Sequence, residues 1–268
     1  MHSHVRFRVA VTGWLIATAT PIVCFGQGAT ATAPPPSAVD SFTVSDLADI
    51  RSVSVSDLSS DGRWLAVTVA SRRDGFGTDF HRDGDPTYLR GAVTELLVID
   101  TRSLELRPVF RTKVPVREAS WSPDGSRLAM LVLENDALHV RVWERATGRF
   151  TSPKLPAGQY VAENSELEWM RNGTGLVFAT RTEAWKAKAR ARFEELTRGP
   201  ITVLDASDPF LEWDEMRRIA NERSIVAWDL ASGSVRTLRA GGLIGEWTLA
   251  EDGSAITIQE DITKKTDY

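Results

Sequence analysis

The chain has 268 residues, of which 42% are hydrophobic and 25% are charged, and its formal net charge is −4 at pH 7. These proportions are typical of a folded globular protein and argue against a disordered chain. Acidic and basic residues are interspersed, so the sequence lacks the basic stripe that nucleic-acid binding requires, and we expect no nucleic-acid partner.

The first 26 residues have the pattern of a secretory signal peptide. A weakly basic head precedes a mostly apolar run from Val9 to Phe25. This run is shorter than the roughly 20 residues that a membrane span needs, and Pro21 interrupts it. We therefore predict cleavage after Gly26 or near Ala31, no membrane span after signal removal, and export to the periplasm or the extracellular space.

Residues 27–41 contain the run ATATAPPPS and are predicted to be a flexible linker. Cys24 is the only cysteine, and it lies in the predicted signal peptide. The mature chain would therefore have no disulfide and no cysteine metal site, and we expect its stability to come from packing alone.

Four similar segments recur in the remaining chain, residues 42–268. Each places a large apolar residue three positions before Asp-Gly or Asn-Gly and alternating apolar residues after the glycine. They are LSSDGRWLAV from Leu58, WSPDGSRLAM from Trp121, WMRNGTGLVF from Trp169 and LAEDGSAITI from Leu249. A period of two predicts strands, and glycine after Asp or Asn provides the positive φ of a tight turn. Each segment is predicted to be a β-hairpin with one buried face.

A second kind of hairpin follows three of these segments, with a strand that runs into Asp100, Glu144 or Asp229 and then a small polar turn. Two successive hairpins make a four-stranded sheet, and sheets repeated along a chain predict a β-propeller. The predicted fold class is all-β, a partial β-propeller of about three and a half four-stranded blades with a short helical insertion. Because a closed propeller needs roughly four blades or more, we expect residues 42–268 to be the N-terminal part of a longer one.

Two insertions interrupt the repeat. Residues 71–93 are rich in Asp, Gly and Arg, whereas residues 182–222 contain the helix-like sequences EAWKAKARARFEEL and DPFLEWDEMRRIANE. The sequence does not decide which insertion would face a substrate.

Three stretches resemble the N-terminal propeller of secreted S9 serine peptidases, the prolyl oligopeptidase family that includes dipeptidyl and acylaminoacyl peptidases. They are FTVSDLADIRSVSVSDLSSDGRWLAVTV from Phe42, VREASWSPDGSRLAMLV from Val116 and RSIVAWDLASGSVRTL from Arg223. The resemblance implies a propeller that gates peptide access to a C-terminal α/β-hydrolase domain, absent from this chain, which carries a Ser, Asp, His triad.

The Ser-Pro-Asp-Gly repeat is less specific, because TolB-like and WD40-like propellers share it, whereas the Phe-Thr-Val-x-Asp-Leu opening favours the peptidases. One alternative is a TolB-like periplasmic propeller that acts as a protein-binding module. Another is a truncated product with no function of its own.

The chain contains no Gly-x-Ser-x-Gly nucleophile elbow, so we assign no catalytic residue to it. Ser122, Ser126 and Ser234 fall in predicted hairpin turns, and only His81 and His139 remain after signal removal. We likewise assign no cofactor-binding or metal-binding residue and expect no cofactor. A peptide substrate would be bound through the full-length protein, by residues that this sequence leaves unidentified.

The sequence DFHRDGD offers four possible metal ligands at alternate positions: Asp79, His81, Asp83 and Asp85. The twelfth position of an EF-hand loop counted from Asp79 would be Arg90 instead of a bidentate glutamate. We therefore predict a solvated loop between strands.

Glu194 and Glu195 are a pair of carboxylates on a predicted helix, and paired glutamates bind the substrate amino terminus in dipeptidyl peptidases of the family that this chain resembles. The surrounding residues do not match that family motif. The basic residues before the pair favour i,i+4 ion pairs on a solvated helix face.

Six of the nine tryptophans fall in or beside predicted strands, and we predict that they pack between blades. They are Trp64, Trp121, Trp143, Trp169, Trp228 and Trp247.

Overall fold

The computed structural model describes residues 42–199, 207–250 and 253–265, so the predicted signal peptide and linker lie outside the described residues. Residues from Thr43 onward form one compact unit. Within the described part of the chain, no helix has both the length and the apolar character that crossing a membrane requires.

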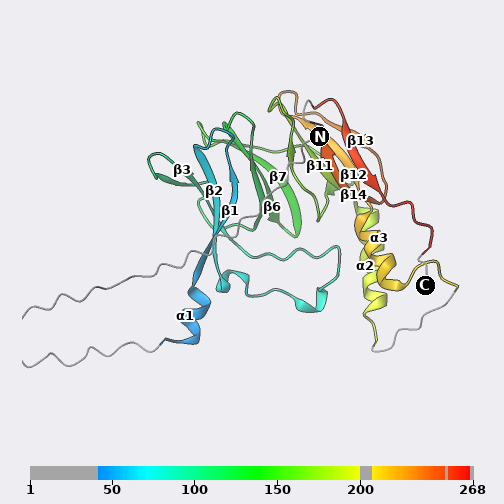
Figure 1. Cartoon of the computed structure of the whole chain (residues 1–268). Helices are drawn as coiled ribbons and strands as arrows, with labels where there is room; N and C mark the ends of the chain where they lie inside the picture. The colour runs from blue at the N-terminus through cyan, green and yellow to red at the C-terminus, as the bar shows by residue number, and fades with distance from the viewer. Residues whose placement is uncertain (1–41, 200–206, 251–252, 266–268) are drawn as a thin grey trace, which may run out of the picture. The chain divides into compact units, whose positions relative to one another are not determined.

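The first blade is a four-stranded antiparallel sheet (Figure 1). Its strands, in spatial order, are β1 (Arg51–Leu58), β2 (Trp64–Ser71), β3 (Glu95–Asp100) and β4 (Leu106–Pro108). A short helix, α1 (Val44–Asp49), precedes it, and Thr43 caps this helix in a capping box with Asp46.

The next two blades share one nine-stranded sheet. Blade 2 consists of β5 (Val116–Trp121), β6 (Arg127–Glu134), β7 (Ala137–Glu144) and β8 (Phe150–Thr151). Blade 3 consists of β10 (Glu168–Trp169), β11 (Gly175–Thr182), β12 (Ser224–Asp229) and β13 (Val235–Arg239). Between them, β9 (Gln159–Val161) pairs with β7 through Leu138 and Val161 and with the end of β11.

A last hairpin, β14 (Ile244–Leu249) and β15 (Ile256–Glu260), occupies the position of the first half of a fourth blade. Two helices, α2 (Glu183–Leu196) and α3 (Glu212–Asn221), stand between β11 and β12, and the 3-10 helices η1 (Arg72–Gly75) and η2 (Phe80–Arg82) stand between β2 and β3. The prediction of an all-β partial propeller with a short helical insertion is confirmed.

The repeated Ser-x-Asp-Gly turn is held by its own side chains. The hydroxyl of Ser59 donates to Asp61 at 2.6 Å and accepts from the backbone N–H of Trp64 at 2.8 Å, while Asp61 accepts from the N–H of Arg63 at 3.0 Å. Gly62 completes the turn with φ +69°. The chemistry of the turn is therefore local, which explains why it can be recognised in the sequence.

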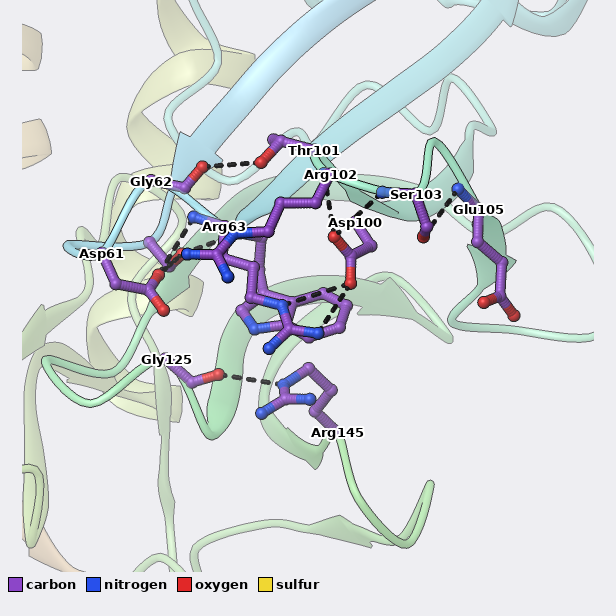
Figure 2. A network of polar contacts seen from close by, with 12 residues as sticks. Asp61, Gly62, Arg63, Asp100, Thr101, Arg102, Ser103, Glu105, Gly125 and Arg145 are labelled. Carbon is purple, nitrogen blue, oxygen red and sulfur yellow. Dashed lines mark hydrogen bonds and ion pairs between the residues drawn. The ribbon is translucent and has the colours of Figure 1, made fainter.

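The second turn of each blade is fastened to the first. Backbone N–H groups of Thr101, Arg145 and Leu230 each donate to a carbonyl of the first turn of the same blade, at 2.9, 3.0 and 2.9 Å. Figure 2 shows the side-chain equivalents, in which Thr101 Oγ1 donates to the carbonyl of Gly62 and Arg145 Nε to that of Gly125. Paired turns thus form one end of every complete blade.

Two turn glycines offer a matched test of packing between blades. Gly62 and Gly125 both have positive φ, but a Cβ on Gly62 would meet no atom within 4 Å, whereas one on Gly125 would lie 3.3 Å from Ser59 Cβ in blade 1. We expect Gly62→Ala to cost about 1 kcal/mol from backbone strain alone and Gly125→Ala about 2 kcal/mol or more. Urea unfolding of both variants measures the difference, and equal losses would contradict a tight contact between the two turns.

The core consists of three apolar clusters between successive blades. On β6, Leu128, Met130 and Val132 belong to the cluster shared with blade 1, whereas Ala129 and Leu131 belong to the cluster shared with blade 3. The prediction of hairpins with one buried face is therefore wrong for blades 2 and 3, because a blade with a neighbour on each side buries both faces. The third cluster joins blade 3 to the last hairpin.

The six tryptophans that were predicted to pack between blades lie in or against these clusters. Trp121, Trp143, Trp228 and Trp247 are at most 5% exposed, and Trp64 and Trp169 pack against the clusters as partly buried residues.

Blade 1 has an outward face of the same construction. Leu65 and Val67 occupy the positions that Leu128 and Met130 hold in blade 2, relative to the turn glycine. Val55, the cross-strand neighbour of Val67, is 67% exposed, and Val53, two residues before it on β1, is 65% exposed. This face has the apolar character of an interface between blades but is open to solvent along β1.

Candidate functional site

Both insertions occupy the same connection of a blade, the one between its second and third strands. The insertion of blade 1 follows β2, and that of blade 3 follows β11. In blade 2 this connection is the two-residue turn Asn135–Asp136, with φ of 50° and 59°. We call this end of the blades the insertion end. Because this turn is short, the insertion of blade 1 can pass over the insertion end of blade 2.

Residues 72–93, which we call the strap, make that crossing. Leu89 is 9% exposed and joins the apolar cluster between blades 2 and 3, and a Cβ on Gly91 would lie 3.6 Å from Leu133 on β6. Farther along, a Cβ on Gly84 would lie 3.3 Å from the ring of Trp213 in α3. The strap therefore runs from blade 1 over blade 2 to the helices of blade 3 (Figure 1).

The strap is more ordered than the solvated loop that the sequence predicts. Asp85 is 7% exposed and accepts from Arg82 at 2.7 Å and from the N–H of Thr87 at 2.8 Å, while Arg82 also lies 4.7 Å from the ring centre of Tyr88. The prediction missed this burial because it depends on contacts that form only when the strap folds back on itself.

The four possible metal ligands of the strap do not converge. The Asp79 side chain accepts from the N–H of His81, Asp83 pairs with Arg90 at 2.6 Å, and Asp85 pairs with Arg82. Across the described ranges, no group of three or more His, Cys, Asp or Glu side chains is arranged to hold a metal ion.

The two helices at the insertion end form a small core of their own. Its buried side chains are Trp185, Ala189, Phe193, Met216 and Ile219. Arg192 of α2 also pairs with Glu215 of α3 at 2.8 Å.

Glu194 and Glu195 point away from this core. Their side chains are 61% and 62% exposed, and they pair with Arg190 and Arg192 of the same helix at 3.0 and 2.9 Å. The i,i+4 ion pair that the sequence favours is present on a solvated helix face.

A buried ion pair anchors these helices to blade 3. The side chains of Arg181 and Glu163 are 1% and 6% exposed and meet at 2.7 Å. The guanidinium also donates to the carbonyls of Glu222 and Ala220 at the end of α3 and stacks 3.7 Å from the ring centre of Trp185. Burial lowers the pKa of Arg181, and the neighbouring carboxylate of Glu163 opposes this shift.

A second buried arginine lies nearby. Arg223, the residue before β12, donates to the carbonyls of Ile244, Gly245 and Asn164, and burial lowers its pKa as well. It ties blade 3 to the last hairpin and to the loop that carries Glu163.

The opposite end of the blades, where the paired turns lie, carries a second polar network (Figure 2). Two guanidinium groups lie over the ring of Trp64. That of Arg145 is 4.0 Å from the ring centre, and that of Arg63 is 4.9 Å from it. Arg63 also pairs with Asp100 at 3.1 Å. The cation–π contact of Arg145 with Trp64 joins blades 1 and 2 and is stabilising in its own right.

The three serines of the predicted hairpin turns bond to residues of the turns themselves. Ser122 is buried and donates to Asp124, Ser126 also bonds Asp124, and Ser234 contacts Ser232. Within the ranges that the structure describes, neither His81 nor His139 is hydrogen-bonded to a serine hydroxyl. Both histidines are exposed.

Asp124 makes the turn of blade 2 sensitive to acid. The hydroxyl of Ser122, and then the N–H and hydroxyl of Ser126, stabilise its carboxylate and lower its pKa from 3.8 to about 2. A carboxyl whose pKa is depressed in the folded state stabilises the fold fully above about pH 4 and loses this contribution as the pH falls towards 2. We expect the urea midpoint to fall less steeply across this range in Asp124→Asn than in the wild type. Parallel pH profiles would contradict this assignment.

Sequence reasoning missed Arg181 and the contact between the strap and α3. A cation inside the apolar strand GLVFATRT was a usable signal for a buried ion pair. The contact of Gly84 with Trp213 joins residues far apart in the sequence, and no local pattern reports it.

No protein-family model matches the chain. A curated relative, the Tol-Pal system protein TolB of Bordetella pertussis, is 36% identical over 76 residues, which are 28% of this chain and 16% of that protein. The chain thus matches only a small part of the length of this relative.

Solved structures similar to this chain include propellers of both kinds that the sequence resembles. An acylaminoacyl peptidase of Pyrococcus horikoshii has a TM-score of 0.48 at 8% identity, with 82% of this chain and 30% of that chain covered. TolB of Acinetobacter baumannii has a TM-score of 0.42 at 10% identity, with 78% and 43% covered.

Proposed function

We propose that this chain is the N-terminal portion of the propeller of an exported S9-type serine peptidase, with residues 1–26 as its signal peptide and residues 27–41 as a linker. In that protein it gates the access of peptides to an α/β-hydrolase domain outside this chain. The observation that carries the proposal is the meeting of the strap and α3 at the insertion end. An end covered by ordered insertions, opposite an end of tight turns, suits a filter for substrate size.

The segment before blade 1 also lies at the insertion end. Arg51, the first residue of β1, pairs with Ser71, the last residue of β2, and Arg73 of the strap bonds Asp49 of α1 at 2.5 Å. The Phe-Thr-Val-x-Asp-Leu opening thus forms a capped helix beside the strap, and its Val44 and Leu47 are 83% and 40% exposed. We propose that these apolar side chains contact other parts of the full-length enzyme.

The exported protein provides the test. An antibody against residues 42–199 locates the band, and a serine-directed fluorophosphonate probe reports an active nucleophile in it. A labelled band far larger than 29.6 kDa is expected if the chain belongs to a serine peptidase. An unlabelled large band would contradict the proposal.

A second candidate function is a periplasmic propeller that binds proteins without chemistry. The 76-residue similarity to TolB at 36% identity favours it. It predicts the unlabelled large band, together with recovery of a partner protein when the exported protein is cross-linked and purified.

A further inference from the structure

We propose that the outer part of the strap, residues 76–88, is a hinged flap that latches on Trp213 of α3 and controls the passage of peptides at the insertion end. The hinge and the latch follow from the contacts of this chain, and the control of passage rests on the proposed function.

The flap is internally rigid. Tyr88 accepts from the N–H of Asp79 at 2.7 Å, Arg82 pairs with Asp85, and Arg90 pairs with Asp83. Within the described chain, every hydrogen bond and ion pair of residues 76–90 has both partners between residues 73 and 90. A segment whose polar bonds are all internal can move as one body without breaking any of them.

The base of the flap is fixed at a narrow neck. The N–H of Val93 donates to the carbonyl of Asp74 at 3.2 Å, and the carboxylate of Asp74 binds Lys113 at 2.7 Å and the N–H of Ser71 at 2.7 Å. Leu89, which follows the flap, is buried in the apolar cluster between blades 2 and 3 and anchors that end of it. The flap therefore has a defined place about which to turn.

The tip is held by an apolar contact instead of by polar bonds. Gly84 has φ +86° and lies against the ring of Trp213, which is 48% exposed and rests edge-on against Phe193 with 6.3 Å between ring centres. A side chain at position 84 would lie too close to the ring and would strain the backbone. A small apolar contact of this kind can break without a large cost in free energy. Because only a residue without a side chain fits against the ring, the flap would dock in one position.

Hydrogen exchange on the full-length exported protein tests the latch. In Trp213→Ala we expect the amides of residues 76–88 to exchange roughly tenfold faster or more, because the flap spends more time away from α3, where its internal hydrogen bonds lack the support of the docked position and open more often. Gly84→Ala, which introduces a Cβ 3.3 Å from the ring, is expected to act in the same direction. Phe42→Ala removes another exposed aromatic ring, 68% exposed, and should leave this exchange unchanged. Unchanged exchange in both latch variants would overturn the proposal.

Peptide cleavage separates the latch from the proposed function. If the flap controls passage, Trp213→Ala raises the cleavage rate of a long peptide relative to that of a dipeptide chromogenic substrate. An unchanged ratio in a protein that the fluorophosphonate probe labels would overturn the control of passage. A protein that the probe does not label would overturn the proposed function, and the exchange result would then decide the latch alone.

Discussion

Replacing Arg181 by methionine is expected to lower the free energy of unfolding by about 3–5 kcal/mol. The replacement leaves the carboxylate of Glu163 buried at 6% exposure without its cation. It also removes the donor from the carbonyls of Ala220 and Glu222, which hold the end of α3. Because removal of one partner strands the other charge in the core, the loss exceeds the net value of the pair itself.

Urea unfolding of three variants tests this expectation. The matched control is Arg190→Met, which breaks the exposed pair with Glu194 on the same insertion, where both side chains are 61% exposed, and should change stability by at most about 0.5 kcal/mol. The double variant Arg181→Met, Glu163→Met removes both charges and should recover part of the loss. Equal destabilisation by Arg181→Met and Arg190→Met would show that the buried pair has no special role.

Phe178→Ala is expected to cost about 3–5 kcal/mol, because it removes a fully buried ring from the cluster between blades 2 and 3. Phe178 is 0% exposed and belongs to the same cluster as Leu131 and Trp228, so little solvent or backbone can fill the cavity. The unfolding free energy from urea titration measures the loss.

The control for Phe178 is Val53→Ala, also an apolar truncation on a strand. Val53 is 65% exposed, and its truncation should change stability by less than about 0.5 kcal/mol. A similar loss for both variants would mean that the outward face of blade 1 is covered in solution as tightly as the faces between blades.

The hairpins could be predicted because their turns are made locally. Asp61 and Asp124 bond N–H groups two residues away, so the Asp-Gly pattern and the turn depend on the same few atoms. The blades follow from these turns by repetition, and the number of blades was predicted correctly for that reason.

The positions of the two insertions in the chain could be predicted from the sequence, but their folded conformations could not. The strap looks like a polar loop because Asp85 and Arg82 are charged, and only the folded strap brings them together in a pair whose carboxylate is buried. The burial of both faces of β6 was missed for a similar reason, because it requires knowledge of two neighbouring blades.

In the candidate site, too, local contacts could be predicted from the sequence and contacts between distant residues could not. The pairing of Glu194 with Arg190 was predicted from a spacing of four residues on one helix. The contact of Gly84 with Trp213 joins the insertions of blades 1 and 3, and the anchoring of α3 by Arg181 joins residues about 40 positions apart within blade 3. Both became visible only in the fold.

Strand β9 has a consequence for the way the protein melts. It pairs with β7 of blade 2 through one residue and with β11 of blade 3, so a strand bridges these two blades. Blade 1 meets blade 2 through side chains: the apolar cluster, the contact of Arg145 with Trp64, and bonds such as that from the N–H of Trp121 to Asp57. In a repeat protein, the strength of coupling between neighbours sets the size of each cooperative unit. We therefore expect blades 2 and 3 to unfold together, and blade 1 to detach from them first as denaturant rises.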